Sequence, residues 1–192
     1  MAKAKAKKSA GASTVYRIKV TLDSSKPPIW RRLEVSSDMT LADLHDVLQV
    51  AMGWGNCHLH MFTIGGENYG RPHPDDFQDV IDERGVKLAD VIGGEKFKFR
   101  YEYDFGDSWN HTLLVEKILP ADPADHYPSC VKGKRNCPPD DVGGIWGYDS
   151  YLEIMANPGH PEHKEMVEWS GGEFDPEEFE IETINAQLRR FG

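Results

Sequence analysis

Two histidines separated by one residue form the first group in this sequence that could do chemistry. The motif is Cys57-His58-Leu59-His60. On a β-strand, residues two positions apart point to the same side, so His58 and His60 would share a face. Neutral imidazoles placed in this way can bind zinc or another transition metal. The competing interpretation is that one histidine is exposed while the other bonds a loop carbonyl.

Cys130 and Cys137 form a second group, in a segment rich in proline and glycine. Six residues separate them, whereas paired cysteines of structural zinc sites are commonly about two to four residues apart. Two thiolate ligands, a redox-sensitive disulfide and two unpaired buried thiols are all compatible with this spacing. Together, the two groups predict a four-coordinate zinc site that pins the long loop to a strand. Its ligands would be His58, His60, Cys130 and Cys137.

A third group lies in a predicted hairpin over residues 97–115, where alternating segments flank a turn rich in Asp and Gly. Simple register puts Tyr103 opposite Trp109 and Tyr101 opposite His111. A nearby carboxylate could orient His111 or raise its pKa, as a general base requires. The competing interpretation is structural, because Asp and Gly are common turn formers and a histidine on an apolar face is usually a core residue.

A ligand pocket is predicted where the tip of this hairpin meets the strand that carries His58 and His60. Aromatic walls with a few convergent polar groups are typical of small-ligand sites. The long 120–147 loop would cover the pocket. The candidate pocket residues are Tyr101, Asp104, Asp107, Trp109, His111, Asp140 and Asp141.

The elements that must position these groups follow from local patterns. Segments rich in β-formers predict strands at residues 15–22, 29–35 and 59–64, the first two paired antiparallel. An apolar stripe from Leu41 to Ala51 predicts a helix, with Thr40 and Asp43 as a capping box and Gly53 at its end. Further helices are expected at residues 86–92, 150–156, 161–169 and from 175 onward.

This order predicts an α+β protein with a mixed or antiparallel sheet. Its opening, strand-strand-helix-strand, is that of β-grasp folds. A central hairpin and C-terminal helices complete the expected architecture.

Length and charge exclude several classes of protein. The 192 residues suit one domain, expected over 15–192 after a mobile basic tail at 1–14. No apolar run approaches the roughly 20 residues that a membrane-spanning helix needs. The net charge of -10 argues against tight nucleic-acid binding, leaving only weak binding through the lysine tail. Three cysteines do not indicate a disulfide-stapled secreted fold, so we expect a cytoplasmic, acidic protein.

Several motifs, in order, resemble the plasmid pRiA4b ORF-3-like family. They are Ile29-Trp30-Arg31-Arg32, Leu41-Ala42-Asp43-Leu44-His45, His58-Leu59-His60-x-Phe62, Tyr103-Asp104-Phe105-Gly106-Asp107-x-Trp109-x-His111, and Cys137-Pro138-Pro139-Asp140-Asp141-x-Gly143-Gly144. The likeness runs from Tyr16 to about Phe179. It implies a bacterial or archaeal protein of a family in which some members are associated with plasmids or transposable elements, and it carries over no established reaction or catalytic residues. Asp141 stands where the family pattern has Glu.

Two functions are therefore expected. The first is a binding or interaction module for an unidentified protein or small molecule, accessory to plasmid or transposon functions. The alternative is a metal-dependent or acid–base hydrolase that uses His58, His60, Asp104, Asp107 and His111.

Overall fold

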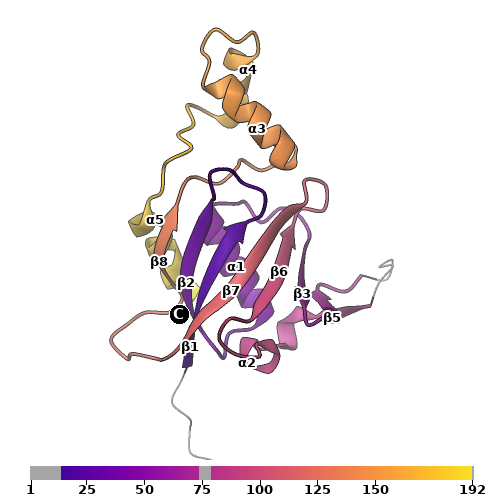
Figure 1. Ribbon diagram of the computed structural model, residues 1–192, viewed down its shortest axis with the longest axis vertical. Helices are drawn as coiled ribbons and strands as arrows, with labels where there is room; N and C mark the ends of the chain where they lie inside the picture. Colours follow the sequence, from indigo (N-terminus) through magenta and orange to yellow (C-terminus); the bar gives the residue numbers. More distant parts are fainter. Residues whose placement is uncertain (1–13, 74–78, 192) are drawn as a thin grey trace, which may run out of the picture.

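The protein is built around one eight-stranded sheet, seen in the computed structural model that describes residues 14–73 and 79–191 (Figure 1). The expected mobile tail lies outside the described residues, except that Thr14 already belongs to the first strand. The strand order is β5-β4-β3-β6-β7-β1-β2-β8. All pairs are antiparallel except β4 with β5, so the sheet is mixed. The predicted α+β class is confirmed.

The elements follow one another in a strand-strand-helix-strand opening, as predicted, before the chain adds further strands and then helices. Their bounds are β1 (Thr14–Leu22), β2 (Trp30–Ser36), α1 (Leu41–Met52), β3 (His60–Ile64), β4 (Glu67–Gly70), β5 (Val80–Asp82), η1 (Glu83–Gly85), α2 (Leu88–Val91), β6 (Lys98–Tyr103), β7 (Trp109–Pro120), β8 (Ser129–Lys134), α3 (Gly144–Met155), α4 (His163–Ser170), α5 (Ile181–Leu188) and η2 (Arg189–Phe191).

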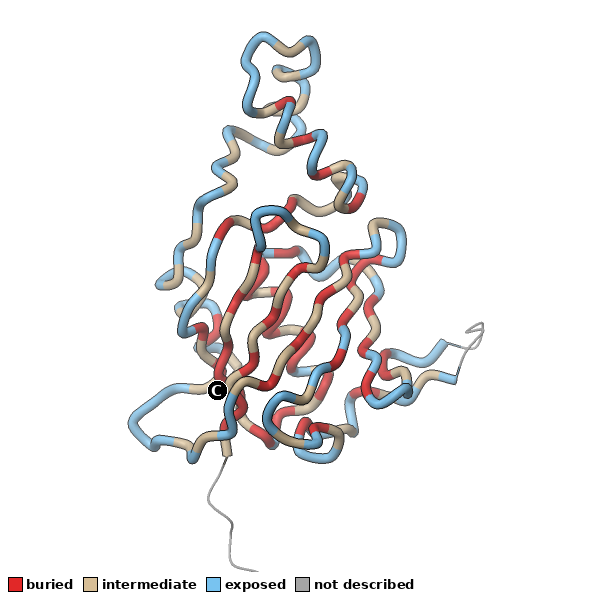
Figure 2. The backbone as a smooth tube through the Cα atoms, in the orientation of Figure 1, coloured by how far each residue is buried: buried red, intermediate tan, exposed pale blue. Residues whose placement is uncertain are grey.

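Helix α1 packs its apolar stripe against one face of the sheet (Figures 1 and 2). Its start is the predicted capping box, in which Thr40 and Asp43 bond each other's backbone N–H groups. Gly53 ends the helix in the left-handed conformation, with φ of 92°. The helix and the alternate residues of the strands form one core, which also receives Leu188 of α5.

The β6–β7 hairpin has the predicted register, with Tyr103 opposite Trp109 and Tyr101 opposite His111. Because side chains alternate along a strand, all four residues point to the same face. That face is the core: Tyr101, Tyr103 and His111 are fully buried and Trp109 is 1% exposed. The aromatic stripe of the hairpin thus forms part of the hydrophobic core.

Residues 120–147 differ from the long loop expected, because β8 lies within them and pairs with β2. Strand β8 lies at the edge of the sheet and pairs on one side only. A segment rich in proline can supply such a strand, because an edge strand forms backbone hydrogen bonds along one side only. Strands β4 and β5 were also not predicted. Gly65-Gly66 forms the turn between β3 and β4, not the end of an isolated strand.

The C-terminal helices start at other residues than expected. Helix α3 begins at Gly144 instead of residue 150, after Gly143 in the left-handed conformation. Helix α5 begins at Ile181 instead of near Asp175, although Asp175 does accept a bond from the Glu177 N–H. Capping signals therefore marked a turn here, not a helix start. Helices α3 and α4 stand beyond the end of the sheet (Figure 1), and no helix among the described residues is long and apolar enough to cross a membrane.

Candidate functional site

The start of β3, the turn of the β6–β7 hairpin and the loop after β8 meet at one end of the sheet. Strand β3 pairs with β6, and the Asp104 N–H donates to the Leu59 carbonyl at 2.8 Å. The loop after β8 is held against the same place by two bonds. Trp54 Nε1 donates to the Pro138 carbonyl at 3.1 Å, and the Gly55 N–H donates to Asp140 Oδ2 at 3.0 Å.

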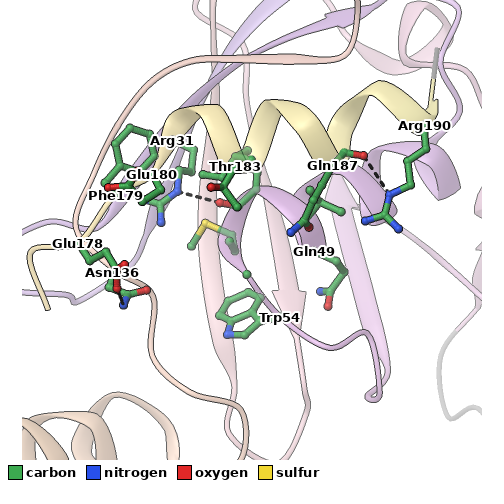
Figure 3. Close-up of a pocket in the computed structure, with 15 residues that line it drawn as sticks. Arg31, Gln49, Trp54, Asn136, Glu178, Phe179, Glu180, Thr183, Gln187 and Arg190 are labelled. Atoms are coloured by element: carbon green, nitrogen blue, oxygen red, sulfur yellow. Dashed lines mark hydrogen bonds between the residues drawn. The ribbon is translucent and has the colours of Figure 1, made fainter. Parts of the chain in front are cut away.

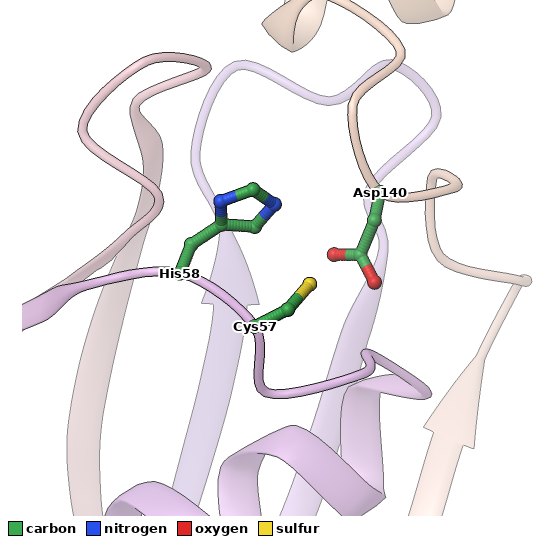
Figure 4. Close-up of side chains that lie close together, drawn as sticks. All are labelled: Cys57, His58 and Asp140. Carbon is green, nitrogen blue, oxygen red and sulfur yellow. The ribbon is translucent and has the colours of Figure 1, made fainter.

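His58 is the centre of this meeting point. Its Nε2 lies 3.1 Å from Asp141 Oδ1 and 3.8 Å from Asp104 Oδ2. Both aspartates have positive φ, 57° for Asp104 and 60° for Asp141, a conformation that Asp tolerates better than most residues. Figure 4 shows the Cys57 thiol, the His58 imidazole and the Asp140 carboxylate pointing into a common space. The hairpin tip, the third strand and the Asp140–Asp141 loop thus converge.

His60 does not share a site with His58, in contrast to the expected His-x-His pair. His60 Nε2 contacts the buried Glu83 carboxylate at 2.8 Å, and its ring stacks on His45 with centroids 3.4 Å apart. The reason is local: β3 begins only at His60, and His58 lies in the preceding turn. The alternation rule that would put both on one face therefore does not apply.

His45, on α1, belongs to a saturated network of hydrogen bonds. Its Nδ1 lies 2.8 Å from the Tyr101 hydroxyl and its Nε2 lies 2.7 Å from Asn56 Oδ1. Gln49 Nε2 donates to the same Tyr101 hydroxyl. Burial, followed by the neighbouring His60, lowers the pKa of His45 to about 3. His45 is therefore neutral near neutral pH.

A cavity of about 570 Å³ opens beside these histidines. The imidazoles of His45 and His60 form part of its wall, and Cys57 and His58 line its edge. The remaining described lining residues are Asn56, Leu59, Met61, Gly70, Arg71, Pro72, His73, Val80 and Phe105.

The four residues of the expected zinc site are not brought together. Among the described residues, the groups of ligand atoms within 4.8 Å of one another are Cys57–His58–Asp140 and His58–Asp104–Asp141. Cys130 is on β8, which five strand-to-strand steps separate from β3. At about 4.8 Å a step, β8 is too far away to share an ion with β3.

Cys137 lies elsewhere again. Its Sγ is buried 3.3 Å from Arg31 Nη2 and 3.8 Å from Met52 Sδ. Burial raises the pKa of the Cys137 thiol to about 11 and also raises that of Cys130. Both cysteines are free and buried. Of the three alternatives compatible with the sequence, the structure therefore agrees with two unpaired buried thiols.

The hairpin residues expected to line a pocket divide into two sets. Tyr101, Trp109 and His111 are core residues and do not line the cavity. Burial lowers the pKa of His111 to about 4, so this imidazole is neutral near neutral pH. Asp104 reaches His58, while Asp107 Oδ2 accepts a bond from the Gly143 N–H. Of the hairpin candidates, only Asp104 joins the cluster around His58. None of the residues predicted to line a ligand pocket lines the cavity of about 570 Å³.

A second cavity, of about 350 Å³, lies between the end of α1 and α5 (Figure 3). Arg31 and Trp54 are among its lining residues, and none of the predicted site residues is. It offers no cluster of metal-binding side chains among the described residues.

Three residues of the site were not identified from the sequence: Cys57, His45 and Glu83. Cys57 directly precedes His58, and a Cys-His pair near a turn could have indicated that Cys57 is a metal ligand. Nothing local marks His45 or Glu83, because helical spacing makes His45 resemble any residue on a buried stripe.

Comparison with known proteins places these features in a family. The profile of the family described as "Plasmid pRiA4b ORF-3-like protein" matches residues 14–183. The chain belongs to the plasmid pRiA4b ORF-3-like family. The resemblance expected from the motifs is thereby confirmed.

One relative in sequence and one solved structure show how much of the chain the similarity covers. "Uncharacterized protein y4hQ" of Sinorhizobium fredii is 41% identical over 160 residues, which cover 83% of this chain and 82% of that protein. The crystal structure of a protein of unknown function, MM3350 from Methanosarcina mazei Go1, is similar with a TM-score of 0.80 and 36% identity. That similarity covers 89% of this chain and 96% of the other. The pRiA4b ORF-3-like fold therefore occurs in both a bacterium and an archaeon.

Proposed function

We propose that this pRiA4b ORF-3-like protein is a small-ligand-binding module whose binding site is the cavity at the start of β3. The observation that carries the proposal is the cavity of about 570 Å³ bordered by the stacked His45–His60 pair. Its size falls within the range of about 300–1,000 Å³ that is typical of ligand sites. Buried polar side chains in its wall supply the convergent groups that fix a ligand's orientation.

The lining favours an organic molecule with an apolar part and an acidic group. Leu59 and Phe105 at the edge of the cavity are 66% and 45% exposed. Exposed apolar side chains are unfavourable in water, and a bound ligand would cover them. Arg71 presents a side chain that is 67% exposed, with its Nε 3.7 Å from Glu83 Oε1. A guanidinium in this position can pair with a carboxylate or phosphate of the ligand.

The test is to fill the cavity and compare binding. Met61 lines the cavity and Thr63, two residues further along β3, is exposed and does not. Compounds from a fragment library that shift backbone NMR resonances of the wild-type protein are titrated into Met61→Trp and Thr63→Trp. We expect Met61→Trp to weaken binding by about ten-fold or more and Thr63→Trp to leave it unchanged.

Two results would contradict this proposal. One is a library in which no compound perturbs resonances around the cavity. The other is equal binding by both tryptophan variants, which would place the ligand on another surface.

A second candidate function, hydrolysis, is favoured by the position of His58 at the edge of the same cavity. Asp141 places a carboxylate oxygen 3.1 Å from His58 Nε2, and a carboxylate beside an imidazole is a common arrangement of a histidine general base. Of the residues expected for a hydrolase, His58 and Asp104 support this candidate. His60, Asp107 and His111 are engaged elsewhere. Hydrolysis of p-nitrophenyl acetate and p-nitrophenyl phosphate, with and without added Zn²⁺, tests it. Equal rates for the wild type and His58→Gln would exclude it for these substrate classes.

An accessory role in plasmid or transposon functions is compatible with either candidate. Its only support is what membership of the family implies, and it stays a prediction.

A further inference from the structure

We infer that Cys57, His58 and Asp140 form a binding site for one divalent transition-metal ion, and that this ion is Zn²⁺. A carboxylate of Asp104 or Asp141 completes the coordination. This site differs from the one expected from the sequence, sharing only His58 with it. The inference does not depend on either proposed function, because metal binding can be measured directly.

The positions of the donor atoms suit such an ion. Ligand atoms of Cys57, His58 and Asp140 lie within 4.8 Å of one another, as do those of His58, Asp104 and Asp141. In a tetrahedral zinc site with bonds of about 2.1 Å, neighbouring nitrogen and oxygen ligands are about 3.4 Å apart. The two distances from His58 Nε2 to carboxylate oxygens, 3.1 Å and 3.8 Å, lie on either side of this value.

Two donor atoms at the site are buried without a hydrogen-bond partner among the described residues. They are Asp140 Oδ1 and His58 Nε2; Asp141 Oδ1 lies 3.1 Å from His58 Nε2 but makes no hydrogen bond with it. Buried polar atoms are almost always satisfied, because leaving one unpaired costs about 1–3 kcal/mol. An ion coordinated by both atoms would satisfy them together.

The carboxylates are also oriented in advance. Asp140 uses Oδ2 to accept from the Gly55 N–H at 3.0 Å and leaves Oδ1 for the site. Asp104 uses Oδ1 to accept from the Gly106 N–H at 2.9 Å and has Oδ2 toward His58. Outer hydrogen bonds that fix one oxygen of a ligating carboxylate are typical of metal centres.

The charge of the site favours a cation. Three carboxylates, those of Asp104, Asp140 and Asp141, lie around one imidazole. In the described part of the chain, no lysine or arginine forms an ion pair with any of them. Like charges held this close repel one another, and a divalent ion would relieve that repulsion.

The mixture of ligands selects the metal. Thiolate and imidazole donors prefer zinc and similar transition metals, whereas calcium and magnesium prefer sites made of oxygen alone. Cys57 is exposed, so its sulfur can reach an incoming ion without the core having to open.

Cobalt substitution is the test, because Co²⁺ bound to a thiolate gives a characteristic charge-transfer absorption. The full chain is purified without a metal-affinity tag, stripped with a chelator and titrated with CoCl₂ and then with ZnCl₂. We expect saturation at one ion per chain, a thiolate band, and displacement by Zn²⁺. Cys57→Ser should lose the band, and His58→Gln and Asp140→Asn should each weaken binding by about ten-fold or more.

Matched controls lie in the exposed loop between β7 and β8 and on β8 itself. His126→Gln, Asp125→Asn and Cys130→Ala change the same residue types outside the cluster and should leave affinity and the band unchanged. Circular dichroism shows whether each variant is folded. Cys57 and Asp125 are exposed, so their substitution should leave the packing of the core unchanged. Absence of saturable Co²⁺ binding would overturn the inference, and so would a thiolate band that survives Cys57→Ser or disappears in Cys130→Ala.

Discussion

At the scale of single residues, the histidines of this protein have two different environments. His58 is partly exposed beside carboxylates, with Asp141 at 3.1 Å. His45 and His111 are buried, and burial lowers the pKa of each, to about 3 and about 4. The same side chain is therefore a candidate ligand in the turn before β3 and a neutral packing element in the core.

The buried histidines predict how stability depends on pH. The folded-state pKa of His111 is about 4, below the 6.5 of an exposed imidazole, so the unfolded chain binds the extra proton between these values. Stability due to this residue is present above pH 6.5 and is lost as the pH falls toward 4. Between about pH 7.5 and pH 5 the loss should be about 2 kcal/mol, given the pKa of about 4.

Urea unfolding at these two pH values measures this loss in the wild type and in His111→Gln. The variant should lose less stability on acidification, whatever its stability at neutral pH. His126→Gln, at an exposed position, should behave like the wild type. An NMR titration in which His111 gains its proton above pH 6 would contradict the prediction.

At the scale of elements, the site depends on the loop between β8 and α3. Trp54 and Gly55 hold Pro138 and Asp140, and Asp107 holds the Gly143 N–H at 3.0 Å. Gly144 has φ of 67° and lies so close to the Asp107 carbonyl that a Cβ would be 2.6 Å from its oxygen. Helix α3 can therefore start against the hairpin only with glycine in its first turn.

Gly147 gives a sharp test of that packing. A Cβ at this position would overlap the Val142 carbonyl oxygen, a backbone atom that cannot move alone. We expect Gly147→Ala to lower the free energy of unfolding by about 3 kcal/mol. It should also weaken Co²⁺ binding, since the loop carries Asp140 and Asp141.

The control is Gly85→Ala, where a Cβ would meet nothing within 4 Å. Its unfolding free energy, from chemical denaturation, should stay within about 0.5 kcal/mol of the wild type. If both alanine variants were equally stable, the tight fit of α3 against Val142 would not exist in solution.

At the scale of the whole molecule, Arg31 joins parts that are far apart in the sequence. It is 3% exposed, and its guanidinium donates to the carbonyls of Ala51 and Lys134. The Phe179 ring stacks on it, with the ring centroid 4.8 Å from Arg31 Cζ. One side chain thereby connects β2, the end of α1, the end of β8 and the segment before α5 (Figure 3).

Replacing Arg31 with methionine keeps the apolar stem but removes the donors. The Ala51 and Lys134 carbonyls would then lose bonds from a charged donor, each of which is typically worth about 1.5–3 kcal/mol. We expect Arg31→Met to destabilise the protein by about 3 kcal/mol or more in urea unfolding. Arg190→Met, at an exposed position on η2, should change stability by less than about 0.5 kcal/mol, and a similar loss in both variants would argue against this role for Arg31.

Much of the fold could be predicted because its signals are local. The Thr40–Asp43 capping box, the helix end at Gly53 and the 97–115 hairpin register all depend on residues within a few positions of one another. The family motifs are equally local and were sufficient to identify the family. Strand β8 was missed, because its pairing with β2 is set by residues about 100 positions away, and the surrounding segment is rich in proline and glycine.

The class of fold, the register of the hairpin and the segments that supply site residues could all be predicted from local patterns in the chain. Which of those residues meet depends on the three-dimensional path of the chain. Asp140 and Asp141 reach His58 across more than 80 positions because Trp54 and Gly55 bind their loop, while strand order keeps Cys130 far from β3. The physical reason is that spacing rules act over one or two turns of chain, whereas a site assembled from distant segments depends on strand order and loop path.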